Sequence, residues 1–270
     1  MKIFDGLKKF LKLLIPLRNR VVLRSHIKWW LSIWMFGGGC ECPCCESRVW
    51  QFGSGGTGFG FRSGAMCTRC GCMERHRLMW LYLKEKTKFF LEPHRVLEIA
   101  PRYWLQKRCL SMKNLNYISI DLFDPVAMKK MDVTALAFKN GEFDCVFCSS
   151  VFETVPDDRC AMREVFRVLK PGGWALIHVY VDWSRNVTFE DGSVNTPEGR
   201  EKYYGGQFNC RIYGADYLNR LEAAGFNVKC SDYVSTFSSL DIKKYGLNNV
   251  KYIFHCLKPN DSASQRIDQC

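Results

Sequence analysis

Two pairs of cysteines near the start of the chain have the spacing of metal ligands. Cys42 and Cys45 form one Cys-x-x-Cys turn, Cys67 and Cys70 form a second, and a glycine-rich loop at 53–60 separates them. Four thiolates from two such turns can close a tetrahedral zinc site. The pattern therefore predicts a zinc-ribbon-like module with a structural zinc ion, because four protein ligands leave no open position for a substrate.

Further cysteines leave the ligand register open. Cys40, Cys44 and Cys72 lie in or beside the two turns and could also be ligands. If Cys70 and Cys72 formed the second pair, only one residue would separate them, which is the wrong spacing for a Cys-x-x-Cys turn. The alternative is a set of unligated thiols in a reducing cytosol. A disulfide framework is disfavoured because the sequence shows no export signal. The remaining cysteines are scattered through apolar segments, where a thiol behaves as a small hydrophobic side chain.

The elements that would position active residues are most regular at 143–181. A short apolar run at 143–148 is bounded by turn residues, which is typical of a strand buried on both faces. After a Pro-Asp start signal, apolar residues recur every three or four positions up to residue 169, as on one face of a helix. Lys-Pro-Gly-Gly at 170–173 predicts a turn, and 174–181 a second strand. The region therefore predicts a strand, helix, strand unit with a right-handed crossover.

Other segments precede this unit in a recognisable order. They are VLEIAP at 96–101, YISIDL at 117–122 and MDVTALAF at 131–138. Together with FDCVFCSSVFETVPDD and REVFRVLKPGGWALIHV, they resemble the ordered motifs of class I S-adenosylmethionine-dependent methyltransferases, in particular the type 11 group. The resemblance covers 96–257. A cysteine knuckle followed by an ERHR-like helix at 72–91 extends it back to about residue 42.

The resemblance implies an α/β fold and an activity. The expected fold is a Rossmann-like, doubly wound, mostly parallel seven-stranded sheet with helices on both faces, preceded by the small zinc-ribbon-like module. The expected activity is methyl transfer from S-adenosylmethionine. The chain then divides into a basic amphipathic leader at 1–39, the module at 40–72, the methyltransferase domain at 73–258 and a polar tail at 259–270.

The cofactor is expected where an open α/β sheet binds its ligands, beyond the carboxyl ends of the strands at the switch point. Asp121 ends the second strand, so its carboxylate is expected to accept hydrogen bonds from the ribose hydroxyls. Asp132 and Val133 are expected to flank the adenine, and Ser149 to lie near the sulfonium. For each acid the alternative is a solvated turn or helix cap. The full predicted cofactor set is Glu98, Ala100, Pro101, Asp121, Leu122, Asp132, Val133 and Ser149.

The sequence departs from the family pattern at two places. Ala100 and Pro101 stand where a glycine-rich signature normally lets the backbone approach the ligand, and proline has no N–H to offer. Serine and threonine replace histidines that the group often has after the fourth strand. We therefore predict no catalytic residue; His178 and Asp182 are candidates for a general base, and neither is assigned.

A polar, aromatic stretch at 188–221 is too long for a simple connector and predicts a lid or an acceptor-binding insertion. The resemblance favours Phe208, Arg211 and Tyr213 as residues that face the substrate. It also implies a small polar acceptor, such as a sugar or glycan precursor. The alternatives are an RNA methyltransferase and a degenerate domain that serves as an interaction module.

Charge is concentrated at the start of the chain. Residues 1–36 hold eight lysines or arginines and one aspartate, so about seven of the twelve net positive charges lie there. Apolar residues on one helical face and tryptophans near the end are typical of a helix in an anionic membrane interface. The alternative is a helix that packs on the protein or on a partner subunit. Nucleic acid is the less favoured partner, and the expected location is cytoplasmic, peripheral to a membrane.

Overall fold

The computed structural model describes residues 16, 19, 20, 22, 23, 27, 36–56, 60–248 and 250–260. Most of the predicted leader and the last ten residues of the predicted tail lie outside these ranges. The predictions made for them, including membrane contact, therefore stay predictions. Within the described ranges, no helix is long and apolar enough to cross a membrane.

A seven-stranded sheet forms the centre of the molecule and confirms the predicted fold class. Its order is β10-β11-β9-β8-β5-β6-β7, and β11 alone runs antiparallel to its neighbours. Within this sheet, the first strand along the chain is β5. The next two, β6 and β7, lie on one side of it, and the chain then crosses to β8 on the other side of β5. The switch point of the sheet therefore lies between β5 and β8. The strand bounds are β5 His94–Ile99, β6 Leu115–Asp121, β7 Lys129–Lys130, β8 Phe143–Ser149, β9 Leu169–His178, β10 Asn227–Asp232 and β11 Tyr252–Leu257.

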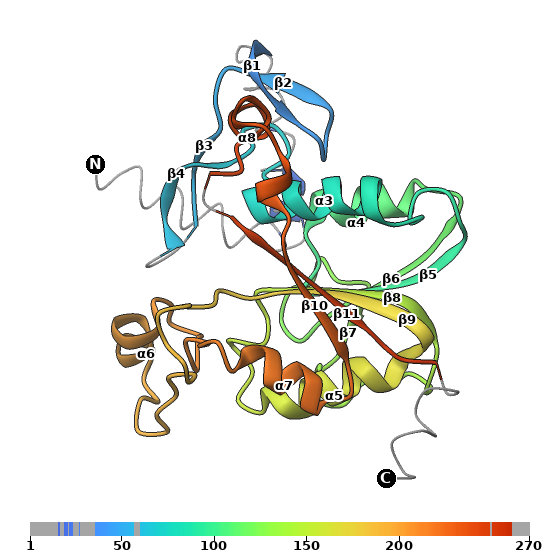
Figure 1. The fold of residues 1–270 in the computed structure, drawn as a ribbon, viewed down its shortest axis with the longest axis vertical. Coiled ribbons are helices and arrows are strands. Elements are labelled where there is room, and N and C mark those ends of the chain that lie inside the picture. The colour runs from blue at the N-terminus through green and yellow to red at the C-terminus, as the bar shows by residue number, and fades with distance from the viewer. Residues whose placement is uncertain are drawn as a thin grey trace.

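Helices cover both faces of this sheet. Figure 1 shows α3 and α4 above it and α5 and α7 below it, with α6 beyond one end of the strands. Each face has its own apolar cluster, one with residues of α5 and α7 and one with residues of α3 and α4. The helix bounds are α3 Glu74–Lys86, α4 Tyr103–Leu110, α5 Asp158–Val168, α6 Pro197–Tyr204, α7 Tyr217–Ala223 and α8 Ser239–Tyr245, with a 3-10 turn at Val234–Thr236.

The strand, helix, strand unit at 143–181 forms as predicted, with shifted boundaries. Asp157 caps α5 by accepting a hydrogen bond from the Cys160 amide, which satisfies one of the unpaired amides of the first turn. Apolar residues of α5 at helical spacing are buried against the sheet. The helix ends at Val168, so Leu169 belongs to β9. The Lys-Pro-Gly-Gly segment lies within β9 and does not form a separate turn. Beside it, the pairing of β9 with β8 is irregular.

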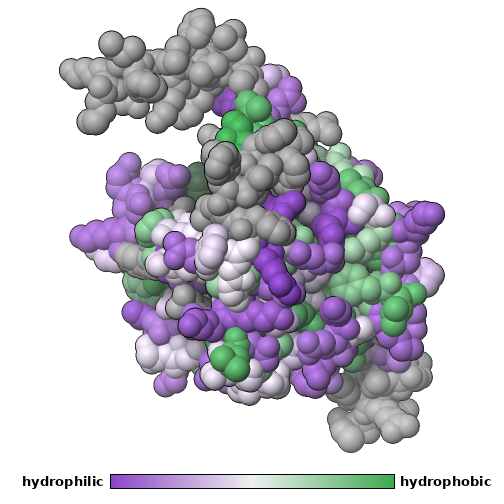
Figure 2. Space-filling model, turned by 90° about the horizontal axis from the view of Figure 1, so that it is seen from above, coloured by the Kyte–Doolittle hydropathy of each residue, from purple (hydrophilic) through white to green (hydrophobic). Residues whose placement is uncertain are grey.

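The cysteine-rich segment folds into two short hairpins against α3. The strands β1 (Phe36–Cys42) and β2 (Ser47–Val49) pair antiparallel, as do β3 (Gly53–Gly55) and β4 (Arg62–Met66). Helix α8 lies beside β1 (Figure 1). Figure 2 shows the molecule from above the view of Figure 1. Hydrophilic side chains cover much of this face, with apolar ones in separate patches between them.

Arg77 joins the cysteine-rich segment to the rest of the molecule. It is fully buried, and its guanidinium donates to the carbonyl oxygens of Tyr245 at 2.6 Å, Gly246 at 2.8 Å, Ala65 at 3.0 Å and Cys72 at 3.2 Å. A buried arginine is tolerated because its fixed fork of donors is satisfied. Arg77 therefore holds the two hairpins, α3 and the end of α8 in one arrangement.

Candidate functional site

Two residues with strained backbones mark the carboxyl edge of the sheet. Ala100 follows β5 with a φ of 56°, and Ser150 follows β8 with a φ of 58°. Non-glycine residues in this left-handed region are uncommon, and they cluster at functional sites. Ala100 therefore adopts a backbone conformation that glycine favours, without the freedom that glycine has. The two strained residues flank the switch point from its two sides.

Asp121 ends β6 at the same edge. Its Oδ1 accepts hydrogen bonds from the amides of Phe123 and Asp124, both at 2.7 Å. Its Oδ2 has no hydrogen-bond partner within the described ranges, so that oxygen is available to a ligand hydroxyl. Asp132 is built alike, with Oδ1 accepting from the Thr134 amide and hydroxyl at 2.8 Å. Each carboxylate is fixed by its own turn and keeps one oxygen for binding.

Glu98 lies behind the cofactor edge. It is 3% exposed, accepts a hydrogen bond from the Arg102 amide at 3.0 Å, and accepts another from the Tyr117 hydroxyl. Burial raises the pKa of Glu98 to about 7, although the bonds from Tyr117 and Arg102 act in the opposite direction. Its contacts fix the turn at 100–102, which is a supporting role for the cofactor site.

The other predicted cofactor residues lie at the same edge with different exposure. Val133 and Pro101 are buried, and Val133 packs in the apolar cluster of the α5 face. Leu122 and Ser149 are half-buried. The structure thus brings the predicted set to the ends of β5, β6 and β8 and to the segment after β7, and their contact with cofactor stays a prediction.

Helix α3 adds residues that lie outside the predicted cofactor set. Arg75 donates to the Ser149 hydroxyl at 3.4 Å, and Arg75 and His76 line a narrow cavity with Ser149 and His178. His76 is 3% exposed, and its ring lies 5.7 Å from that of Trp104 at a tilt of 50°. The signal for these residues in the sequence is the Glu-Arg-His-Arg run that begins α3. Two members of this run have structural roles: Glu74 pairs with Arg62 at 2.5 Å, and Arg77 bonds to backbone carbonyl oxygens.

The site fits S-adenosylmethionine in its chemistry. Two carboxylates with an unpaired oxygen suit hydroxyl and amino donors of the nucleoside, and the half-buried edge between them suits an apolar ring. When bound, the cofactor supplies a methyl group already activated by the positive sulfonium. The residues of this chain then need to hold it, orient the acceptor and exclude water.

The predicted zinc ligands come together. The sulfur atoms of Cys42, Cys45, Cys67 and Cys70 all lie within 4.8 Å of one another, and Cys42 and Cys70 are separated by 3.8 Å. This arrangement fits a tetrahedral four-thiolate site. A second group shares Cys42 and adds Cys44 and Cys72, which accounts for the open register in the sequence.

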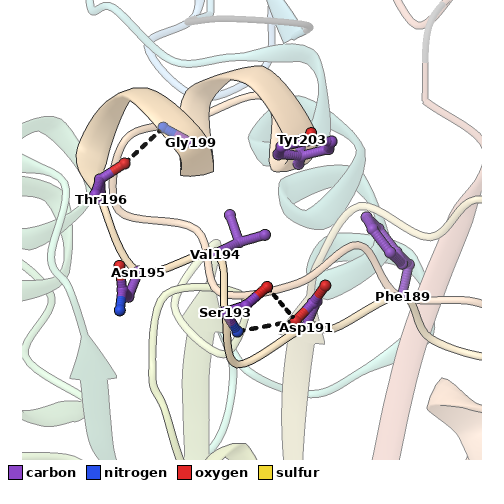
Figure 3. A pocket seen from close by; sticks show the side chains of 8 residues that line it. All are labelled: Phe189, Asp191, Ser193, Val194, Asn195, Thr196, Gly199 and Tyr203. Carbon is purple, nitrogen blue, oxygen red and sulfur yellow. Dashed lines mark hydrogen bonds between the residues drawn. The ribbon is translucent and has the colours of Figure 1, made fainter.

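The insertion after β9 contains a separate pocket of about 300 Å³. Figure 3 shows it between α6, which carries Gly199 and Tyr203, and the preceding loop, which carries Phe189, Asp191 and Val194. The insertion is fastened to the sheet edge, because the Asp182 amide donates to the Tyr213 carbonyl at 2.8 Å and the Cys210 amide to the Glu153 carbonyl at 2.7 Å.

Two residues of the insertion were wrongly expected to face a substrate. Arg211 is 4% exposed and pairs with Glu190 at 2.7 Å, and Tyr213 is fully buried and its hydroxyl donates to Asp158 at 2.7 Å. Their charge and hydroxyl are used to hold the insertion on the domain. Phe208 is 68% exposed, so its side chain is open to solvent.

Comparison with known proteins agrees with this geometry. A sequence model described as a methyltransferase domain matches residues 107–177. No curated protein matches the chain.

Several solved structures are similar. The [4+2]-cyclase SpnF has 16% identity and a TM-score of 0.48, over 68% of this chain and 81% of that one. An S-adenosylmethionine-dependent methyltransferase from Mesorhizobium loti has 13% identity and a TM-score of 0.48, over 67% and 98%. The 1,6-didemethyltoxoflavin-N1-methyltransferase of Burkholderia thailandensis has 13% identity and a TM-score of 0.46, over 69% and 78%.

Similarities at this level of identity carry no argument for an activity. The sequence match is more specific, since it runs from α4 through β6, β7, β8 and α5 into β9. These elements lie on both sides of β5 in the sheet, and β11 is antiparallel to both β9 and β10. The sequence match and the strand order together support an S-adenosylmethionine-dependent methyltransferase domain with a Rossmann-like sheet in this chain.

Proposed function

We propose that this enzyme methylates a small polar acceptor, such as a sugar or glycan precursor. The observation that supports it is the pocket in the insertion, which combines the aromatic rings of Phe189 and Tyr203 with the polar groups of Asp191, Asn195 and Thr196. Aromatic faces with a few polar groups suit a hydroxyl-rich ring. The backbone bonds from the insertion to Glu153 and Asp182 place this pocket's segment beside the sheet edge.

We further propose that Cys42, Cys45, Cys67 and Cys70 hold one structural zinc ion. Four thiolates require a reducing compartment, which supports a cytoplasmic location. The contact of residues 1–36 with an anionic membrane remains a proposal based on their sequence. It predicts that binding to anionic vesicles weakens as salt is added.

The first test of the proposed function is calorimetric titration of S-adenosylmethionine and S-adenosylhomocysteine. Micromolar binding to the wild type is expected to weaken about 10- to 100-fold in Asp121→Ala, because two hydrogen bonds to a charged oxygen are lost. Asp124→Ala removes an exposed acid of the same turn and is the matched control. No binding by the folded wild type would contradict the enzyme assignment.

The acceptor is tested with isotope-labelled S-adenosylmethionine and a panel of monosaccharides, nucleotide sugars and total RNA. Label in a sugar compound, lost in Asp121→Ala, supports the proposal. Label in RNA instead would contradict it and favour the RNA methyltransferase.

A further inference from the structure

The two turns that flank the switch point of the sheet have no free backbone amide. After β5, the Ala100 amide donates to a carbonyl of β6 at 2.9 Å, and Pro101 has no N–H. The Arg102 amide donates to Glu98 at 3.0 Å. After β8, the Ser150 amide donates to a carbonyl of β9 at 2.8 Å. These turns therefore offer no backbone donor to an anionic group of a ligand.

Two arginines reach the same place without an acidic partner. Arg75, in the first turn of α3, is half-buried and donates to the hydroxyl of Ser149 at 3.4 Å. Within the described ranges, neither Arg75 nor Arg102 forms an ion pair with an acid. Burial lowers the pKa of Arg75 to about 10, and the charge of Arg102 acts in the same direction, while the charge of Glu153 opposes both. Arg75 is therefore a positive charge at neutral pH that lacks a bound anion.

His76, the next residue of α3, adds an unused donor. Its Nδ1 accepts a hydrogen bond from the Met73 amide at 3.1 Å, so Nε2 carries the proton. Nε2 is buried and has no hydrogen-bond partner within the described ranges. Buried polar groups are paired in most native structures, so this donor indicates that a ligand supplies its acceptor.

A small cavity brings these side chains together at the cofactor edge. Arg75, His76 and Ser149 line it, and its volume of about 20 Å³ has room for about one oxygen atom. Ile99 of β5 pairs with Cys148 of β8, so the residues that follow them, Ala100 and Ser149, leave the sheet side by side. The cavity thus adjoins the turn after β5, and it shares no lining residue with the pocket in the insertion. A group of the cofactor, and not of the acceptor, is expected there.

We propose that Arg75 binds the α-carboxylate of the methionine part of S-adenosylmethionine, with Nε2–H of His76 as a second donor. The inference rests on the proposed function and adds to it a cofactor-binding residue from α3, outside the residues 107–177 that the methyltransferase model matches. The guanidinium attracts the carboxylate, and its planar fork suits the two oxygens. These side chains take the place of the backbone donors that the turn at 100–102 lacks. Arg75 thereby makes the site selective for a ligand that has a carboxylate.

Calorimetric titration of two ligands that differ only in this carboxylate tests the proposal. S-adenosylhomocysteine carries the carboxylate, and its decarboxylated analogue, S-adenosyl-3-thiopropylamine, does not. In Arg75→Gln the Kd of S-adenosylhomocysteine is expected to rise about 10- to 100-fold, because a hydrogen-bonded charge pair is lost. The Kd of the analogue is expected to change by less than about threefold, since the analogue has no partner for Arg75. The preference of the protein for the carboxylate ligand should therefore be lost.

Three further variants complete the experiment. Arg75→Lys keeps the charge without the planar fork and provides a second measurement if Arg75→Gln does not fold. It is expected to raise the Kd of S-adenosylhomocysteine about 3- to 10-fold and to leave that of the analogue unchanged. Arg163→Gln removes an exposed arginine of α5 and should bind both ligands as the wild type does. Asp121→Ala should weaken both ligands by the same factor, because both keep the ribose.

The outcomes separate this inference from the proposed function. Equal changes of the two Kd values in the Arg75 variants, or no change in either, would overturn the assignment of Arg75 and leave cofactor binding intact. Failure of the folded wild type to bind S-adenosylmethionine and S-adenosylhomocysteine would overturn the proposed function and this inference with it.

Discussion

At the scale of residues, the cofactor edge contains groups in unfavourable states. Ala100 and Ser150 have left-handed backbones, and loss of solvent contact raises the pKa of the buried Glu98 and of the half-buried Glu153 to about 7. Each of these states destabilises the folded chain, so surrounding contacts must hold them in place. Such groups are expected where a ligand or a reaction needs a fixed geometry.

Ala100→Gly is expected to stabilise the fold. Glycine adopts a φ of 56° without the steric cost that alanine has there, which is about 1–2 kcal/mol, and part of this gain is offset by the greater freedom of glycine in the unfolded chain. The free energy of unfolding, measured with urea, is expected to rise by about 0.5–1 kcal/mol. Binding of S-adenosylmethionine should be kept.

The matched control for this substitution is Ala223→Gly. Ala223 is exposed at the end of α7 and has ordinary helical geometry. Glycine there is expected to lower the free energy of unfolding by about 0.5–1 kcal/mol. A loss of stability in both variants would show that the backbone at residue 100 carries no strain.

At the scale of elements, an ion network fastens the insertion to the loop after β8 and to the start of α5. Arg211 pairs with Glu190 at 2.7 Å, and Arg220 pairs with Asp158 at 3.0 Å. Arg211 also donates to the carbonyl oxygens of Phe152, Val155 and Pro156 at 2.6–2.7 Å. Burial would raise the pKa of Glu190, but the hydrogen bonds from Arg220 and Arg211 bring it down to about 2. At neutral pH the network is therefore fully charged and paired.

Arg211→Ala is expected to destabilise the protein by about 3 kcal/mol or more, because it leaves the carbonyl oxygens of Phe152, Val155 and Pro156 without their donor. Urea unfolding measures the loss. Arg185→Ala removes a half-exposed arginine from its ion pair with Asp182 and should cost at most about 1 kcal/mol. Similar losses in the two variants would mean that the buried network adds nothing beyond a surface ion pair.

At the scale of the whole molecule, the cysteine-rich segment and the methyltransferase domain share a core. The apolar cluster on the α3 side includes Cys42, Cys67 and Phe52 together with Leu78 of α3 and Val96 of β5. Arg77 bonds to both parts, and Lys244 of α8 pairs with Glu41 at 3.0 Å. A change in the cysteine-rich segment should therefore reach α3, whose first turn lines the cavity.

Loss of the metal is expected to destabilise the whole domain. Cys42→Ser with Cys45→Ser should reduce the zinc content from about one ion per chain to none, and should lower the free energy of unfolding by roughly 3 kcal/mol or more. Metal analysis after dialysis and thermal unfolding measure the two effects. Cys160→Ser, at a half-buried thiol of α5, is the control and should keep the zinc. Full zinc content in the double variant would exclude this ligand set.

The sequence determined the order of the elements and the residues at strand ends. Apolar runs and helical spacing predicted β8 and α5, because burial of a strand or of one helix face requires those periods. The position of Asp121 at the carboxyl end of β6 followed from the order of the motifs. The pairs of cysteines predicted the sulfur cluster, since two knuckles bring four thiols to one point.

Only the tertiary structure decided what each charged residue does. Arg75 and Arg77 are two positions apart on α3 and look alike in the sequence, yet one lines the cavity and the other is buried among carbonyl oxygens. Arg211 was expected to face a substrate and instead holds the insertion. Glu153 lies in a loop without a periodic pattern, and the charge of Arg75 acts on it. Arg75 reaches this loop from α3 and bonds to Ser149, which is 74 residues later in the chain. Spacing along the chain fixes local partners, whereas burial and charge depend on segments that only folding brings together.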